Sequence, residues 1–132
     1  MKLHHVGIVV PDIQNSLGEL KKFMSFQSIS LPMPVETRKV NVCFLKIGGP
    51  FLELIEPVSS DSDIAEFAEK GGGIHHLCFE VSDIEKEIHE LTAKGAKLLV
   101  SPEKGFDERR IAFLDLGVKT NCGLIELLEK LD

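Results

Sequence analysis

The sequence has no long run of basic residues, no CxxC pair and no long apolar stretch. A formal net charge of −6 at pH 7, without a basic run to follow a phosphate backbone, argues against nucleic acid as the main partner. Three cysteines without CxxC spacing argue against a disulfide framework or a zinc knuckle and favour a reducing, cytoplasmic setting. No apolar stretch approaches the roughly 18 residues that span a bilayer, and no apolar leader follows Met1, so we expect a soluble protein without membrane contact.

The length of 132 residues suits one domain, or two small modules that share one core. Two glycine-rich segments, Gly48-Gly49 and Gly71-Gly72-Gly73, lack the GxxxxGK(S/T) context of a phosphate-binding loop. We therefore interpret these glycines as parts of turns.

The chain contains one internal repeat. Leu3-His4-His5-Val6 matches Ile74-His75-His76-Leu77 at an offset of 71 positions, and Leu52-Glu53-Leu54 matches Ile125-Glu126-Leu127 at an offset of 73. Each half therefore offers one histidine and one glutamate in equivalent places. A duplicated module with one nitrogen and one oxygen donor per copy is a candidate for a four-ligand metal site at the junction of the copies.

The first half shows the pattern of a strand, a helix and a hairpin. Residues 3–10 are rich in β-branched side chains, and Pro11-Asp12 ends this strand and can cap a helix. Val40 to Ile47 and Phe51 to Ile55 are predicted strands, and one further short strand before Val40 gives the order β-α-β-β-β. The helix is indicated by apolar residues at helical spacing: Ile13, Leu17, Leu20 and Met24.

The second half repeats this order after a structured linker. Asp61-Ser62 is expected to cap a short helix that continues to Lys70 and ends at Gly71-Gly72-Gly73. One helix per module with several strands predicts an α+β fold, in which each sheet packs its helix on one side. The elements expected after the linker are a strand at Ile74 to Val81, a helix at Asp83 to Lys94, and a hairpin of Ile111 to Leu116 with Leu124 to Leu128.

The two faces of each strand carry different residues because side chains alternate along it. His4 shares a face with three β-branched residues, which is expected to meet the helix, so His5 lies on the opposite face. The same alternation places His76 opposite its helix. Glu53 and Glu126 are each flanked by apolar side chains on their own face. A divalent cation bound by these carboxylates and two imidazoles would remove the cost of burying the carboxylates.

These motifs resemble those of the vicinal oxygen chelate superfamily, which includes glyoxalase I, methylmalonyl-CoA epimerase, extradiol dioxygenases and fosfomycin or bleomycin resistance proteins. The resemblance covers nearly the whole chain and is closest to the methylmalonyl-CoA epimerase and glyoxalase I-like branch. It is carried by His4-His5-Val6-Gly7-Ile8, Phe51-Leu52-Glu53-Leu54-Ile55-Glu56-Pro57, Asp61-Ser62-Asp63-Ile64-Ala65, Gly73-Ile74-His75-His76-Leu77 and Leu124-Ile125-Glu126-Leu127.

The resemblance implies that residues 1–132 form a single domain of two tandem βαβββ modules, whose sheets curl around a shared metal-binding cavity. Module one would comprise residues 1–58, the linker helix residues 59–73 and module two residues 74–132. The family commonly forms homodimers, so we expect one here. Two carboxylates and two imidazoles suit one divalent ion, Co²⁺, Ni²⁺, Mn²⁺ or Zn²⁺. Carried over by position, the metal ligands are His5, Glu53, His76 and Glu126.

The activity implied by the resemblance is metal-assisted proton transfer at the carbon next to a carbonyl, through an enediolate. In an epimerase that acts on an acyl-CoA thioester, a second glutamate from the loop before Val40 works opposite Glu126. Here that position is Thr37, a departure from the family pattern, and Glu36 is the neighbouring candidate. In glyoxalase I, which acts on a glutathione hemithioacetal, Glu53 and Glu126 themselves remove and deliver the proton.

Three functions stay open at this point. An epimerase is favoured over glyoxalase I (lactoylglutathione lyase) because the motifs resemble the epimerases more and no glutathione pocket is evident. A non-catalytic small-molecule or drug-binding module is the alternative of another class, but the presence of all four donors favours an enzyme. A dioxygenase is disfavoured because its iron site uses two histidines and one carboxylate. The candidates for contacts to a substrate anion are Arg38, Lys39, Arg109 and Arg110.

Overall fold

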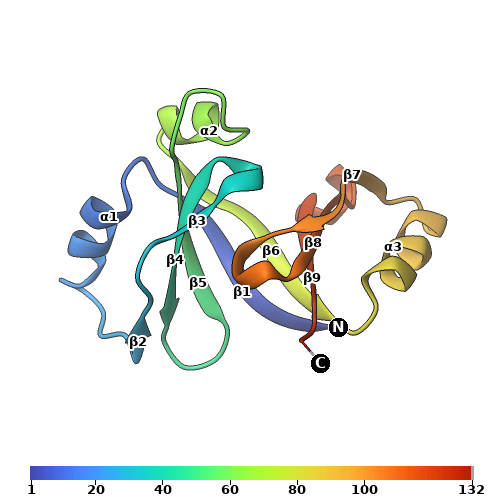
Figure 1. Cartoon of the computed structure of the whole chain (residues 1–132), viewed down its shortest axis with the longest axis horizontal. Coiled ribbons are helices and arrows are strands. Elements are labelled where there is room, and N and C mark those ends of the chain that lie inside the picture. The colour runs from blue at the N-terminus through green and yellow to red at the C-terminus, as the bar shows by residue number, and fades with distance from the viewer. Residues whose placement is uncertain (132) are drawn as a thin grey trace. The chain divides into compact units, whose positions relative to one another are not determined.

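Each half of the chain builds a small sheet with a helix packed on one side (Figure 1). The structure, a computed structural model, describes residues 1–131. Its contacts divide the chain into an N-terminal unit, His5–His75, and a C-terminal unit, which comprises Met1–His4 and the residues from His76 onward. The start of the first strand therefore belongs with the second half of the chain. The module boundaries expected after residues 58 and 73 stay a prediction.

The N-terminal unit has the strand order β2-β4-β5-β1, with β3 also paired to β4. Strand β1 (Lys2–Val9) runs parallel to β5 (Phe51–Pro57), and β5 runs antiparallel to β4 (Val40–Lys46). Two short strands, β2 (Ser28–Ile29) and β3 (Met33–Val35), pair antiparallel with β4. Only one short strand was expected before Val40.

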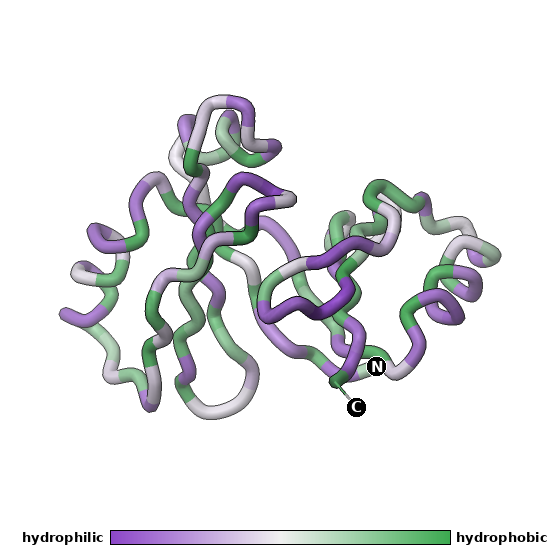
Figure 2. The backbone as a smooth tube through the Cα atoms, viewed as in Figure 1, coloured by the Kyte–Doolittle hydropathy of each residue, from purple (hydrophilic) through white to green (hydrophobic). Residues whose placement is uncertain are grey.

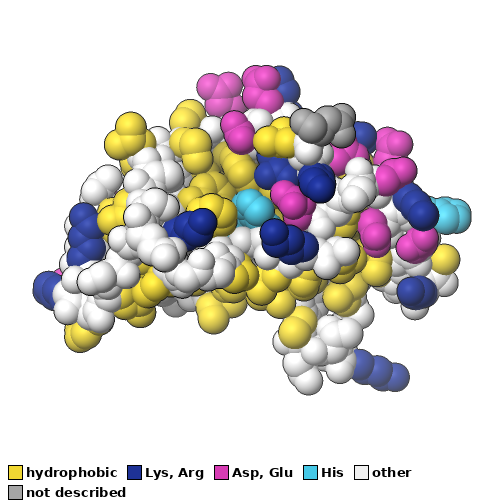
Figure 3. Space-filling view, turned by 90° about the horizontal axis from the view of Figure 1, so that it is seen from below, with side chains coloured by type: hydrophobic (Ala, Val, Ile, Leu, Met, Phe, Trp, Pro, Cys, Tyr) yellow, Lys and Arg dark blue, Asp and Glu magenta, His cyan; other side chains and the backbone are white. Residues whose placement is uncertain are grey.

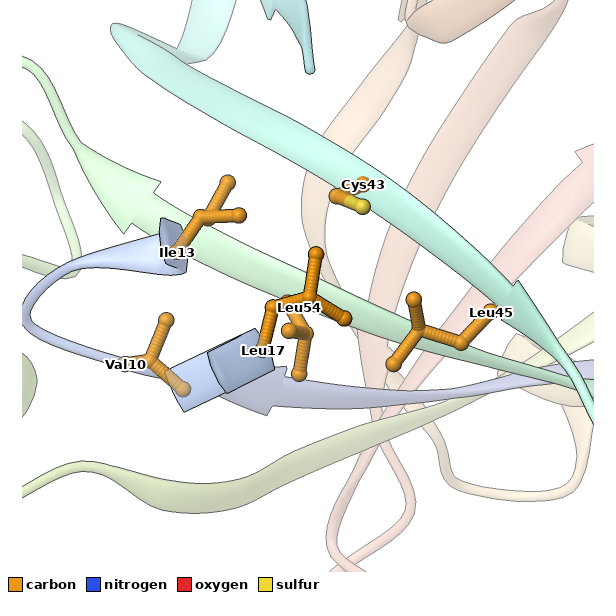
Figure 4. Packing of buried hydrophobic residues seen from close by; sticks show 6 residues of the cluster. All are labelled: Val10, Ile13, Leu17, Cys43, Leu45 and Leu54. Carbon is orange, nitrogen blue, oxygen red and sulfur yellow. The ribbon is translucent and has the colours of Figure 1, made fainter. Parts of the chain in front are cut away.

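Helix α1 (Ile13–Leu20) covers one face of this sheet. The Asp12 carboxylate caps the helix, accepting the N–H of Asn15 at 2.9 Å. Figure 4 shows how the helix contributes to the core of the unit, which consists of Val10, Ile13, Leu17, Cys43, Leu45 and Leu54. Cys43 and Leu45 reach this core from β4 and Leu54 from β5, so the alternate residues of these strands face away from α1.

Helix α1 is shorter than its apolar stripe predicts. It ends at Leu20 and is followed by a turn, so Met24 lies beyond the helix with 41% of its surface exposed. Phe23 is 81% exposed in the same turn. The prediction that the helix includes Met24 was therefore wrong.

The C-terminal unit repeats the plan, with the strand order β6-β9-β8-β7. Strand β6 (Gly73–Val81) runs parallel to β9 (Leu124–Glu129), which is antiparallel to β8 (Arg110–Asp115). The outer strand β7 (Lys97–Lys104) pairs antiparallel with β8 and contains two register shifts. The expected α+β class with repeated strand order is confirmed.

Helix α3 (Ile84–Ala93) covers the C-terminal sheet as α1 covers the N-terminal one. Asp83 caps it by accepting the N–H of Lys86 at 3.1 Å, and Gly95 follows it with φ +107°. Figure 2 shows hydrophobic and hydrophilic residues alternating along this helix, as expected for a helix with one buried face. Figure 3 shows charged side chains of both signs gathered on the α3 side of the view. No helix within residues 1–131 is long and apolar enough to cross a membrane.

The linker contains α2 (Ala65–Glu69), which begins later than expected. Asp61 and Ser62 do not cap it. The Asp61 carboxylate pairs with Lys39 and with the Ser59 hydroxyl, and the Ser62 hydroxyl donates to the carbonyl of Arg38 at 3.2 Å. These contacts fix the linker to the 3₁₀ helix η1 (Glu36–Arg38) instead.

Gly72 follows α2 at a place where no other residue fits. A Cβ atom there would lie 2.2 Å from the carbonyl oxygen of Val9, and φ is +70°. We expect Gly72→Ala to lower the free energy of unfolding by about 3 kcal/mol, through backbone strain and the displacement of β1. Urea denaturation followed by circular dichroism measures this loss.

Gly73→Ala is the matched control for this substitution. Gly73 also has positive φ, +119°, but a Cβ there would meet nothing within 4 Å. Its expected cost is the backbone strain alone, about 1 kcal/mol. Equal losses for the two variants would contradict the close approach of Gly72 to Val9.

Candidate functional site

The N-terminal unit brings His5 and Glu53 together. His5 lies on β1 beside Phe51, and Glu53 lies beside Gly7 in the same parallel pairing, so both side chains project from the face opposite α1. We call this the ligand face of the unit. His5 Nε2 lies 3.1 Å from Glu53 Oε1, and the two side chains are 0% and 5% exposed.

The C-terminal unit contains the same arrangement. His76 Nε2 lies 3.1 Å from Glu126 Oε1, and these side chains are 3% and 5% exposed. Both residues lie on the face opposite α3, which is the ligand face of this unit. Alternation along the strands thus correctly selected His5 over His4 and His76 over His75 as partners of the glutamates. The His4 ring instead stacks on Phe106, with centroids 5.9 Å apart.

A phenylalanine supports each histidine. Phe44 pairs with Glu53 across the β4–β5 ladder and meets the His5 ring edge-on at 5.5 Å and 73°. Phe113 pairs with Glu126 across β8–β9 and meets His76 at 5.4 Å and 85°. These contacts restrict the rotation of both imidazoles. The repeated Phe-Leu of the sequence, at 44–45 and 113–114, is the signal of this support.

The donor atoms of each pair fit a divalent cation. In both pairs the imidazole nitrogen and the carboxylate oxygen are at the hydrogen-bonding distance of 3.1 Å, so one nitrogen and one oxygen donor stand side by side. Imidazole nitrogen with carboxylate oxygen is a combination that Zn²⁺, Co²⁺, Ni²⁺ and Mn²⁺ accept. A buried carboxylate also needs a compensating positive charge or donor, which a cation supplies.

A family model described as the Glyoxalase/Bleomycin resistance protein/Dioxygenase superfamily matches residues 4–113. The chain belongs to this superfamily. The resemblance noted in the sequence is thereby confirmed, and with it the vicinal oxygen chelate fold. The match includes three of the four donors, His5, Glu53 and His76, and ends before Glu126.

Relatives with a common activity align over nearly the whole chain. The mitochondrial methylmalonyl-CoA epimerase of Bos taurus is 33% identical over 131 residues, which cover 96% of this chain and 73% of the relative. The ethylmalonyl-CoA/methylmalonyl-CoA epimerase of Cereibacter sphaeroides is 33% identical over 130 residues, 96% of each chain. A Streptomyces coelicolor methylmalonyl-CoA epimerase variant in complex with 2-nitronate-propionyl-CoA has a similar structure, with a TM-score of 0.86 and 26% identity over 100% of this chain and 99% of that one.

Cys78 shares the ligand face of the C-terminal unit with His76. It is 0% exposed and packs in an apolar cluster with Ile111 and Leu128 on the ligand face of the C-terminal unit. A thiol packed in this way contributes to the core as a small hydrophobic side chain. The cluster also keeps water from the surroundings of Glu126, whose neighbour Phe113 packs against it.

Two further glutamates, one in each unit, have a defined structural role. The Glu56 carboxylate accepts the N–H of Ile13, the first residue of α1, at 2.7 Å, and Glu129 accepts the N–H of Ile84, the first residue of α3, at 3.1 Å. Each ties the start of a helix to the strand that carries a donor glutamate three positions earlier. The signal was the repeat itself, because 56 and 129 share the offset of 73 that relates the donor glutamates.

The four cationic residues considered for substrate anions are each engaged with a carboxylate. Arg109 donates to Glu80 at 2.6 Å and to the carbonyl of Glu129 at 3.0 Å. This guanidinium holds the pKa of Glu80 below its usual range. The other pairs are Arg38 with Asp63, Lys39 with Asp61, and Arg110 with Glu85. Hydrogen bonds from Lys39, which has the larger effect, and from Ser59 lower the pKa of Asp61 to about 2. Their charges are therefore largely satisfied within the protein.

Glu36 is the remaining sequence-predicted catalytic residue. It is exposed at the first position of η1, and Thr37 follows it, also exposed. Lys39 ends this helix in a left-handed conformation with φ +54° and pairs with Asp61 of the linker. The linker therefore holds the loop that carries Glu36. The role of Glu36 in proton transfer stays a prediction.

Proposed function

We propose that this chain is a divalent-metal-dependent methylmalonyl-CoA epimerase. The observation that carries the proposal is the duplicated, buried histidine–glutamate pair, on a chain whose relatives are named as epimerases of this substrate. Those relatives favour the epimerase over glyoxalase I and over a non-catalytic binding module. The substrate in this proposal is an acyl-CoA thioester.

We assign His5, Glu53, His76 and Glu126 as the ligands of one divalent ion, Co²⁺, Ni²⁺, Mn²⁺ or Zn²⁺. Support comes from the equivalence of the two pairs in the repeat and from the donor separation of 3.1 Å within each pair. Such an ion acts as a Lewis acid that polarises a carbonyl oxygen of the substrate. The edge-on contacts of Phe44 and Phe113 hold the imidazoles in orientation.

The carboxylates move the proton in this proposal. In an epimerisation, the C–H bond next to the thioester carbonyl breaks, the proton passes to a carboxylate, and a proton returns to the opposite face of the same carbon. We assign Glu126, with Glu53 or Glu36, to these transfers. Glu53 and Glu126 are 4% exposed and lie among apolar side chains, and exclusion of water favours proton return from the carboxylate over loss to solvent.

Assembly and location are part of the same proposal. We expect a homodimer, as is common in the superfamily, and a cytoplasmic enzyme. Cys43, Cys78 and Cys122 are free thiols, in keeping with a reducing compartment. Light scattering of the purified protein measures the oligomeric state.

The test is metal analysis of the untagged protein by mass spectrometry, followed by assays of Co²⁺- and Ni²⁺-loaded samples. We expect about one ion per chain, and turnover of methylmalonyl-CoA but not of the methylglyoxal–glutathione hemithioacetal. His76→Ala is expected to remove the ion. Turnover of the hemithioacetal alone would assign glyoxalase I, and protein that binds no metal after loading would overturn the enzyme assignment.

A further inference from the structure

The two ligand faces differ at one equivalent position. Phe44 and Phe113 correspond, because each pairs across its ladder with the donor glutamate of its unit. Two residues further along the same strand faces lie Lys46 in the N-terminal unit and Asp115 in the C-terminal unit. The two units thus have the same donor residues, but at this neighbouring position one carries a lysine and the other an aspartate.

Aromatic rings link His5 to Lys46. The Phe44 ring meets His5 at 5.5 Å and Phe51 at 5.7 Å, both edge-on. The Lys46 ammonium lies over the Phe51 ring, 5.9 Å from its centroid. Lys46 therefore lies on the same face as the donors, at the end of a series of contacts that runs from His5 through Phe44 and Phe51.

The charge of Lys46 stays available to a ligand. Within residues 1–131 it forms no ion pair, in contrast to Arg38, Lys39, Arg109 and Arg110. Its side chain is exposed, and contact with an aromatic ring orients an ammonium without neutralising it.

Asp115, the equivalent residue, is committed to the protein. Its carboxylate accepts the N–H of Gly117 at 2.8 Å and so closes the turn after β8. The N-terminal unit therefore presents an ammonium at the position where the C-terminal unit has a carboxylate that is hydrogen-bonded within its own turn.

We propose that Lys46 binds an anionic group of the substrate, with Phe51 beneath the uncharged chain next to that group. This inference rests on the proposed function. The anion is a carboxylate or a phosphate, and an acyl-CoA thioester such as methylmalonyl-CoA carries both. Lys46 is a specificity-determining residue that orients the substrate on the N-terminal unit, without a part in proton transfer.

The experiment is steady-state kinetics of the metal-loaded Lys46→Met enzyme with methylmalonyl-CoA. We expect KM to rise about tenfold, the size of one charge-assisted hydrogen bond, with kcat within about twofold and metal content unchanged. Lys46→Arg is expected to restore KM. The matched control is Lys21→Met, which removes an exposed lysine at the end of α1, on the opposite side of the sheet.

The pantetheine thioester of methylmalonate identifies the anion, because it keeps the carboxylate and lacks the phosphates of CoA. If Lys46→Met raises KM for this substrate as well, the partner is the carboxylate; if the effect disappears, it is a phosphate. Equal KM values for Lys46→Met and Lys21→Met overturn the inference. Binding of methylmalonyl-CoA to both variants is also measured by calorimetry. If the protein binds this compound without turning it over, the epimerase proposal fails, and the binding affinities of the two variants still test the role of Lys46.

Discussion

Glu126→Gln lowers the rate of epimerisation by about three orders of magnitude, because the amide neither takes up a proton nor supplies a charged donor oxygen. The change removes the carboxylate that lies 3.1 Å from His76 Nε2. The measurement is incorporation of deuterium from solvent into methylmalonyl-CoA, with metal content determined on the same sample. We expect epimerisation to be lost, and exchange to be lost in the epimer whose proton faces Glu126.

Glu129→Gln is the matched control for this prediction. Glu129 lies three residues further along β9, and its carboxylate accepts the N–H of Ile84 at the start of α3. This variant is expected to lose about 1 kcal/mol of stability. At temperatures below its unfolding transition, its turnover is expected to be unchanged. Comparable loss of turnover in both variants, with metal still bound, would show that Glu126 acts through the stability of the sheet rather than through chemistry.

The partner choice at each donor pair was predictable because it depends on local rules. Side chains alternate along a strand, and the repeat fixes which strands correspond, so His5 with Glu53 and His76 with Glu126 followed from the sequence. The cap of α1 by Asp12 was equally local. The fold class followed from the same periodicities.

Other features depend on contacts between distant residues and were missed. The strand β7 contains Pro102 and two register shifts, features that weaken the pattern of an edge strand. The expected cap by Asp61-Ser62 was wrong because Lys39 and the carbonyl of Arg38 compete for these side chains from η1. The contacts of Glu56 and Glu129 with the helix starts join residues more than forty positions apart along the chain.

The engaged cations change how a substrate is expected to bind. Arg109 was a candidate anion contact on sequence grounds, but its side chain is 7% exposed and is held by Glu80. Removing a buried guanidinium from its carboxylate to serve a ligand would leave Glu80 uncompensated. An exposed ammonium such as that of Lys46 carries no such cost. We therefore expect the side chain that binds the substrate anion to be one that forms no ion pair within the protein.

Glu36→Gln separates the two carboxylate schemes. If Glu36 is the second proton-transfer residue, its loss lowers kcat for epimerisation by about 10²- to 10⁴-fold. Proton exchange by Glu126 on its own face of the substrate continues, so one epimer of methylmalonyl-CoA still exchanges its hydrogen with deuterated solvent while the other does not. Stereospecific exchange followed by NMR detects this difference, which a general loss of folding cannot produce.

Thr37 supplies the control for that experiment, because it occupies the position where the epimerase pattern expects the glutamate. Thr37→Ala is expected to leave kcat within about twofold, since its side chain brings no titratable group. In the double variant Glu36→Gln with Thr37→Glu, epimerisation returns if a carboxylate at either position of η1 reaches the substrate. Unchanged kcat in Glu36→Gln would instead assign both transfers to Glu53 and Glu126, which have the same burial and the same histidine contact in the two halves of the repeat.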